Sequence, residues 1–65
     1  MIHKFKSRTL LKDVEEYTEA LAKETGETIW VYKIKTCYYC CFKNEIPEGV
    51  DALYFSCKYG NFKNN

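Results

Sequence analysis

The stretch TIWVYKIKTCYYCCF, residues 28–42, is the part of the sequence that decides the fold. It is dense in β-branched and aromatic residues, which favour β-strands. Its length exceeds that of a usual strand, which has about five or six residues. We therefore expect two strands, near residues 28–34 and 37–43, joined by a tight turn near residues 33–36.

The length of that turn decides which side chains share a face of the sheet, because a shift of one residue exchanges the two faces. A three-residue turn at residues 34–36 groups Trp30, Tyr32, Tyr38, Cys40 and Phe42 with Leu53, Phe55 and Cys57. A two-residue turn at residues 35–36 instead groups Ile29 and Val31 with Tyr38, Cys40 and Phe42. This alternative leaves Trp30, Tyr32, Ile34 and Tyr39 on the other face. Two-residue hairpin turns favour Gly or Asn, and Lys35-Thr36 has neither, so we expect the three-residue turn. With either turn, we expect Tyr39 and Tyr54 to project from one face of the sheet and Leu53 and Phe55 from the other.

Upstream of this stretch, residues 9–25 have the periodicity of an amphipathic helix. Ser7 or Thr9 can cap its first turn, and Gly26 is placed to end it in a left-handed conformation. Residues 2–6, within the segment 1–8, are compatible with a short edge strand. The expected apolar stripe of the helix consists of Leu10, Leu11, Val14, Tyr17, Leu21 and Ala22.

Downstream, residues 43–50 form a loop that contains Pro47 and Gly49. Residues 51–59 alternate between apolar and polar side chains and predict a third strand, whereas residues 60–65 are expected to fray. The whole chain, residues 1–65, is thus expected to be one α+β domain. Its N-terminal helix would pack on a small antiparallel sheet of three strands, or of four if residues 2–6 join it.

The length and the motifs argue against catalysis. A domain of 65 residues buries only about 60% of the surface that its unfolded chain exposes, which leaves little core around a deep pocket. The sequence has no Gly-rich phosphate loop, and His3 is its only histidine. The carboxylates have no apolar setting that would separate the pKa values of an acid and a base. We therefore expect no enzymatic activity and no cofactor.

The composition also bears on the setting of the protein. The start of the chain shows no signal peptide, and no apolar run is long enough to span a membrane, so we expect a cytoplasmic protein without membrane contact. Residues with AT-rich codons (Phe, Tyr, Met, Ile, Asn, Lys) number 28, against 8 with GC-rich codons (Gly, Ala, Arg, Pro). This bias indicates a low-GC bacterium, or a phage or mobile element that acts in such a host cell.

The four cysteines provide a metal-binding alternative. Cys37, Cys40, Cys41 and Cys57 contain a single C-x-x-C pair, whereas two-knuckle zinc sites have two such pairs. Alternation along a strand would also send Cys37 and Cys40 to opposite faces. We interpret the cysteines as small apolar residues, with a zinc-stabilised domain as a weaker alternative, and we expect no metal.

Two surface features suggest binding. An aromatic sheet face is expected from Trp30, Tyr32, Tyr39 and Tyr54, and an acidic helix face from Asp13, Glu16 and Glu19. Our leading hypothesis is a non-enzymatic interaction protein that binds and inhibits or redirects a larger bacterial protein, such as a basic enzyme that acts on nucleic acids. The alternative is a module that binds single-stranded nucleic acid through aromatic and lysine side chains, although the pI of 7.6 is low for that role. Unpaired sheet edges also leave a homodimer open.

Overall fold

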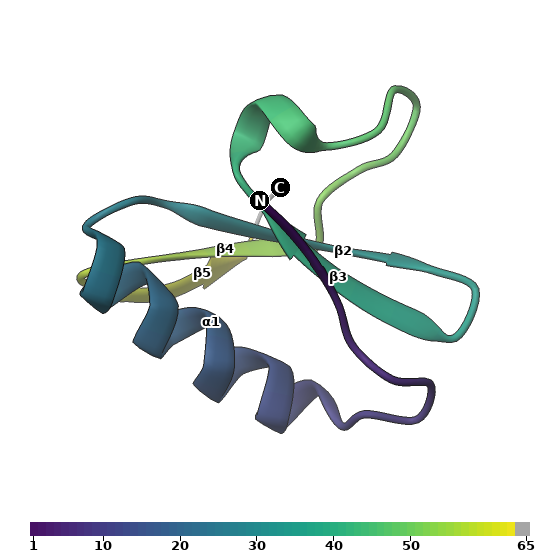
Figure 1. Ribbon diagram of the computed structural model, residues 1–65, viewed down its shortest axis with the longest axis horizontal. Helices are drawn as coiled ribbons and strands as arrows, with labels where there is room; N and C mark the ends of the chain where they lie inside the picture. The colour runs from purple at the N-terminus through teal and green to yellow at the C-terminus, as the bar shows by residue number, and fades with distance from the viewer. Residues whose placement is uncertain (64–65) are drawn as a thin grey trace.

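The computed structural model describes residues 1–63 and places one α-helix against a five-stranded antiparallel sheet (Figure 1). The α+β class is confirmed, whereas the expected count of three or four strands was too low. In chain order the elements are β1 (Ile2–Lys4), α1 (Leu11–Thr25), β2 (Ile29–Ile34), β3 (Cys37–Cys41), a 3-10 turn (Lys43–Glu45), β4 (Tyr54–Cys57) and β5 (Gly60–Lys63).

The strand order β1-β3-β2-β4-β5 contains two crossover connections. Helix α1 links β1 to β2, and the loop of residues 42–53 links β3 to β4. Each crossover joins two parallel strands, β1 to β2 and β3 to β4, and the first pair runs opposite to the second. Both connections move across the sheet in the same direction. Two crossovers of the same hand must therefore lie on opposite faces of the sheet. Figure 1 shows this arrangement, with α1 below the sheet and the loop above it. We call the face toward α1 the inner face and the other the outer face.

The hairpin of β2 and β3 has the two-residue turn, which was the less favoured of our two alternatives. Trp30 pairs with Cys41, Tyr32 with Tyr39, and Ile34 with Cys37, so that only Lys35 and Thr36 lie between the strands. Lys35 adopts a left-handed conformation, with φ of 57°. A positive φ at the first central position alone is the pattern of a type II′ turn, where Gly is the usual residue. The prediction of a three-residue turn was wrong because Lys35 occupies the first central position of the turn, which usually requires glycine.

The register assigns each side chain to a face. Ile29, Val31, Tyr38, Cys40, Tyr54 and Ser56 belong to the inner face, and Trp30, Tyr32, Tyr39, Cys41 and Phe55 belong to the outer face. Tyr39 therefore lies on the same face as Phe55, which corrects the expectation that these two residues lie on opposite faces.

Helix α1 ends as expected and begins differently. Gly26 has a φ of 72°, and its N–H donates to the Ala22 carbonyl at 2.9 Å, which confirms the left-handed cap. The helix begins at Leu11, and its N-cap residue Leu10 makes no side-chain cap. The predicted caps bond elsewhere: the Thr9 hydroxyl donates to the Lys6 carbonyl at 2.6 Å, and the Ser7 and Thr36 hydroxyls lie 2.9 Å apart.

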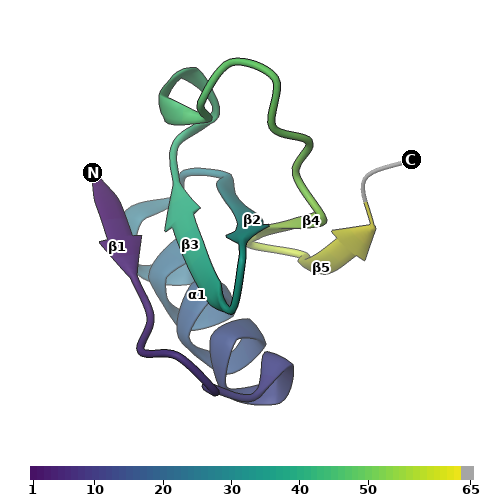
Figure 2. The same ribbon diagram turned by 90° about the vertical axis from the view of Figure 1, so that its right-hand side faces the viewer.

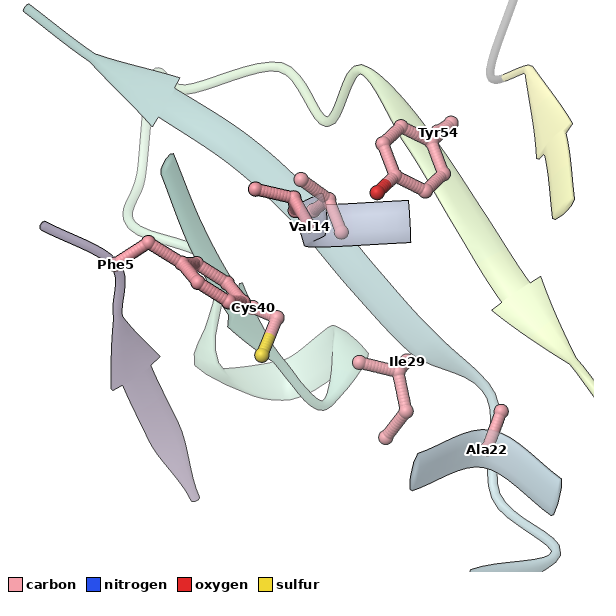
Figure 3. Close-up of a cluster of buried hydrophobic side chains, with 7 residues drawn as sticks. Phe5, Val14, Ala22, Ile29, Cys40 and Tyr54 are labelled. Carbon is pink, nitrogen blue, oxygen red and sulfur yellow. The ribbon is translucent and has the colours of Figure 1, made fainter. Parts of the chain in front are cut away.

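The core lies between α1 and the inner face (Figure 3), where Phe5, Val14, Ala22, Ile29, Val31, Cys40 and Tyr54 form one buried cluster. The predicted stripe of the helix was only partly right. Val14 and Ala22 are buried, but Leu10 and Leu11 are 65% and 42% exposed. Thr18 takes the central buried position instead. No helix within residues 1–63 is long and apolar enough to cross a membrane.

The predicted third strand near residues 51–59 is present as the shorter β4, and the chain then folds back in a hairpin that we did not predict. Strand β4 ends at Cys57, and after Lys58 and Tyr59 the chain returns as β5 (Figure 2). Frayed ends were expected for residues 60–65. This was wrong for 60–63, and residues 64 and 65 lie outside the described part of the chain. The expected edge strand near the start is confirmed as β1, which pairs with β3.

Candidate functional site

The outer face carries one row of apolar side chains that crosses all five strands. Cross-strand pairing connects Ile2 to Cys41, Cys41 to Trp30, Trp30 to Phe55, and Phe55 to Phe62. Directly opposed residues in an antiparallel sheet project from the same face, so these five side chains form a continuous row. This row is the main candidate for a binding surface.

Three rings of the row contact one another. The centroids of Trp30 and Phe55 are 4.7 Å apart with the rings tilted by 38°, and those of Phe55 and Phe62 are 5.6 Å apart in a stacked arrangement. Trp30 and Phe55 are half-buried, and Phe62 is 45% exposed. We call these three residues the ring row. Because its rings are packed against one another, they lose little side-chain freedom when a partner binds.

A second ring pair lies beside the row. Tyr32 and Tyr39 stack at 5.0 Å with nearly parallel planes. Tyr32 is only 2% exposed, and burial raises the pKa of its phenol, whereas Tyr39 is half-buried. The Lys4 ammonium lies 6.0 Å from the centre of the Tyr39 ring. Of this pair, Tyr39 is therefore the ring that a partner can reach.

The crossover loop of residues 42–53 lies over part of the outer face (Figure 1). On this face Cys41 and Tyr32 are almost fully buried although they project away from α1, and the Tyr39 ring stacks on Tyr32. Lys43 of this loop places its ammonium 5.4 Å from the centre of the Trp30 ring. The loop carries three carboxylates, Glu45, Glu48 and Asp51, against this single lysine.

Glu45 fastens the loop to the start of the chain. One of its carboxylate oxygens accepts the Phe42 N–H at 3.0 Å, and the other accepts from the Met1 ammonium. These hydrogen bonds, the one from the Met1 ammonium first, hold the pKa of Glu45 below its usual value. The loop therefore has a defined position over the outer face.

The structure separates the four aromatic residues that we grouped from the sequence. Trp30, Tyr32 and Tyr39 lie on the outer face, but Tyr54 lies on the inner face and is 6% exposed. Its hydroxyl is 3.4 Å from that of Thr18 (Figure 3 shows it directed toward α1), and burial raises its pKa to about 12. Including Tyr54 in the partner-binding face was therefore wrong, because β4 pairs with β2 in the register that turns Tyr54 inward.

The predicted acidic helix face is less acidic than its sequence suggests. Asp13 and Glu16 are exposed, but Glu19 accepts hydrogen bonds from Lys23 at 3.3 Å and from Asn61 at 3.2 Å. Glu19 thus contributes to holding β5 against α1. Only Asp13 and Glu16 remain of the three acids that we assigned to partner binding.

The cysteines do not gather into a metal site. Cys40 projects to the inner face and Cys41 to the outer face, and both are fully buried, whereas Cys37 and Cys57 are half-buried. Within residues 1–63, no three His, Cys, Asp or Glu side chains come together to bind a metal ion. His3 packs against the rings of Tyr17 and Phe5, at 4.7 and 4.6 Å.

Sequence reasoning missed the contribution of β5. Phe62 completes the ring row, although we expected its segment to be frayed. It also lines an open cleft of about 390 Å³ at the β5 side of the sheet, with Leu11, Glu15, Leu53, Tyr54, Asn61 and Lys63. The signal that could have predicted a second hairpin is Gly60, which follows Lys58-Tyr59 and lies between two segments in which apolar and polar residues alternate.

Comparisons of this chain with protein-family models, with curated proteins and with solved structures give no match.

Proposed function

We propose that this chain is a non-enzymatic module that binds a larger protein through its outer face. The observation that carries the proposal is the ring row of Trp30, Phe55 and Phe62, with Tyr39 beside it on the same face. Large aromatic side chains are favoured anchors in protein interfaces. A sheet face whose rings are held in place and still accessible is suited to that role.

The charges around the ring row favour a protein partner over a nucleic acid. The loop beside the row has three carboxylates, one of which (Glu45) is paired with the Met1 ammonium, and one lysine. Lys4 adds a second lysine near these rings. A nucleic-acid surface needs several cations to neutralise phosphates, because these contacts supply much of the affinity. The outer face lacks such an excess of positive charge.

The partner that we propose is a larger bacterial protein, which this chain inhibits or redirects. We propose the cytoplasm of a low-GC bacterium as the setting, with the chain encoded by that bacterium or by a phage or mobile element, because the composition favours residues with AT-rich codons. Asp13 and Glu16 on the helix provide a second surface that suits a basic partner, such as an enzyme that acts on nucleic acids.

Affinity capture from a low-GC bacterial lysate, in reducing buffer and with nuclease, tests the proposal. The expected result is one stoichiometric protein that survives nuclease and is lost with Trp30→Ala or Tyr39→Ala. Tyr59→Ala is the matched control, because Tyr59 is an aromatic residue that is 78% exposed in the β4–β5 turn, away from the row. Glu16→Lys tests the helix face separately, and circular dichroism confirms that each variant is folded. Capture that is equally strong with all variants would refute binding through the outer face.

Single-stranded nucleic acid is the second candidate, because Lys43 over Trp30 and Lys4 near Tyr39 combine cations with rings. This candidate predicts binding of a labelled oligonucleotide at low salt, seen by fluorescence anisotropy and weakened by Tyr39→Ala. With two lysines at the site, the dependence of affinity on salt should be shallow. Absence of binding at low salt would exclude it.

A further inference from the structure

Within residues 1–63, strand β5 forms one edge of the sheet, since it is last in the strand order and its pairing partner is β4. Alternate backbone N–H and C=O groups along its free side are therefore available to another strand. The opposite edge, β1, has three residues, whereas β5 has four and lies beside the open cleft. The β5 edge is thus the more extended site for strand pairing.

The side chains along β5 differ between the two faces. Phe62 projects to the outer face at the end of the ring row, with 45% of its surface exposed. Asn61 and Lys63 project to the inner face, where the Asn61 amide donates to Glu19 of α1 at 3.2 Å. An aromatic group, a cation and an anion therefore lie along the same edge.

We propose that this edge binds a second copy of the chain, by antiparallel pairing of the two β5 strands around a two-fold axis at Phe62. Such an axis places Phe62 opposite Phe62 of the second copy, and Lys63 opposite Asn61 of the second copy. The interface is isologous, so every contact occurs twice. The resulting sheet would run continuously through both copies.

On the outer face, this register extends the ring row. Directly opposed side chains in an antiparallel pair have Cβ atoms about 4.5–5.5 Å apart, which is close enough for two phenyl rings to contact. The contacts Trp30–Phe55 and Phe55–Phe62 would then continue through the second Phe62 to the matching rings of the other copy. The pairing covers Phe62, which is the most exposed ring of the row.

On the inner face, the same register brings opposite charges together. Asn61 is bonded to Glu19, so Lys63 of one copy would lie beside the carboxylate of Glu19 in the other. The two-fold axis repeats this ion pair at the other end of the interface. A different extended peptide would need its own aromatic residue and cation in the same register, whereas a second copy supplies both by symmetry. This inference goes beyond the proposed function and does not depend on it.

Sedimentation equilibrium of the purified full chain in reducing buffer tests the proposal by charge exchange. The wild-type chain should dimerise as its concentration rises. Lys63→Glu and Glu19→Lys should each weaken dimerisation by about tenfold or more, because each variant alone places like charges together at both ends. An equimolar mixture of the two variants should recover dimers, since the mixed pair restores opposite charges at both ends.

Two further variants keep the test decisive. Lys58→Glu makes the same charge change in the β4–β5 turn and should dimerise like the wild type. Phe62→Ser should weaken dimerisation even if Glu19→Lys fails to fold after losing its bond to Asn61, and circular dichroism identifies such a failure. A chain that stays monomeric up to about 1 mM, or a dimer that neither Lys63→Glu nor Phe62→Ser weakens, would overturn the proposal.

Discussion

The hydroxyls of Thr18 on α1 and Ser56 on β4 lie 3.1 Å apart, and both side chains are fully buried. Thr18 also bonds the Val14 carbonyl at 2.9 Å, and Ser56 donates to the Asn61 side-chain oxygen. Asn61 in turn donates to Glu19. A hydrogen-bonded chain thus runs from the core to the surface and joins α1 to β4 and β5. Apolar contacts alone do not fix how a helix is placed along a sheet, whereas directional bonds of this kind do.

Replacing Thr18 with valine tests how much this chain of bonds stabilises the fold. Thr18→Val keeps the shape of the side chain but removes its hydroxyl from a buried position. We expect the free energy of unfolding, measured by urea titration, to fall by about 1–3 kcal/mol. The matched control is Thr25→Val, because the Thr25 hydroxyl also makes hydrogen bonds, donating to the Leu21 carbonyl at 2.8 Å and accepting the Glu27 N–H at 3.2 Å, but at an exposed position of the same helix. The control should change stability by less than about 0.5 kcal/mol, and equal losses would contradict a role for burial.

Lys35→Gly should stabilise the protein, because Lys35 holds a positive φ that glycine adopts without steric cost. A left-handed conformation costs a non-glycine residue about 1–2 kcal/mol, part of which glycine loses again through its larger unfolded-state entropy. We expect a gain of about 0.5–1 kcal/mol in the free energy of unfolding. Thr36→Gly is the control and should not stabilise, because Thr36 has no positive φ and bonds Ser7. A larger gain with Thr36→Gly would mean that the turn has another conformation.

The four thiols should react in two classes with a thiol reagent. Cys37 and Cys57 are half-buried, whereas Cys40 and Cys41 are fully buried. Burial also raises the pKa of Cys40 to about 11 and raises that of Cys41, which suppresses the reactive thiolate. We expect two thiols to react rapidly in the native protein and all four to react in concentrated urea. Mass spectrometry of Cys37→Ser and Cys40→Ser would assign the classes, and rapid labelling of four thiols in the native state would refute this assignment.

Alkaline pH should destabilise the fold through its buried phenol. Burial raises the pKa of Tyr54 to about 12, above the 10.0 of an ordinary tyrosine. Because the folded state favours the neutral phenol, its contribution to stability is complete below pH 10.0. This contribution is lost as the pH rises through about 12, where the phenol also ionises in the folded state. Tyr32, Cys40 and Cys41 also have raised pKa values and add to the loss.

Urea titrations at about pH 8 and at about pH 11 measure this loss. Tyr54→Phe should lose less stability between these conditions than the wild type, because phenylalanine does not ionise. Tyr59→Phe serves as the control on an exposed ring and should keep the wild-type dependence. If Tyr54→Phe and the wild type showed the same loss, the phenol of Tyr54 would not be responsible.

Local patterns predicted the parts of the fold that depend on residues close in sequence. The end of the helix at Gly26 followed from the need for a left-handed residue, and the strands near residues 28–34 and 37–43 followed from β-branched and aromatic residues. In both cases the deciding signal lies within a few residues of the position concerned. The grouping of Trp30, Tyr32 and Tyr39 was not settled in this way, because the three-residue turn that we expected sends Tyr39 to the opposite face, and only the observed two-residue turn brings the three rings to one face.

Two of the parts that failed, the roles of Thr18 and Phe62, depend on residues distant in sequence. The central place of Thr18 in the core depends on Ser56 and Tyr54, which reach it only when β4 pairs with β2. The role of Phe62 depends on β5 returning along β4. Neither relationship leaves a periodic signal in the helix or in the tail.

The sequence by itself determined the class of the protein, the position of its helix and the strand-forming character of residues 28–42, because periodicity, turn residues and β-propensity act locally. Only the tertiary structure decided the faces of the sheet. One turn residue, Lys35, sets the register of β2 and β3, and the pairing of β2 with β4 then turns Tyr54 into the core and leaves Phe55 outside. Since neighbouring side chains in a strand alternate between faces, one residue of register decides which aromatic rings form the core and which are available to a partner.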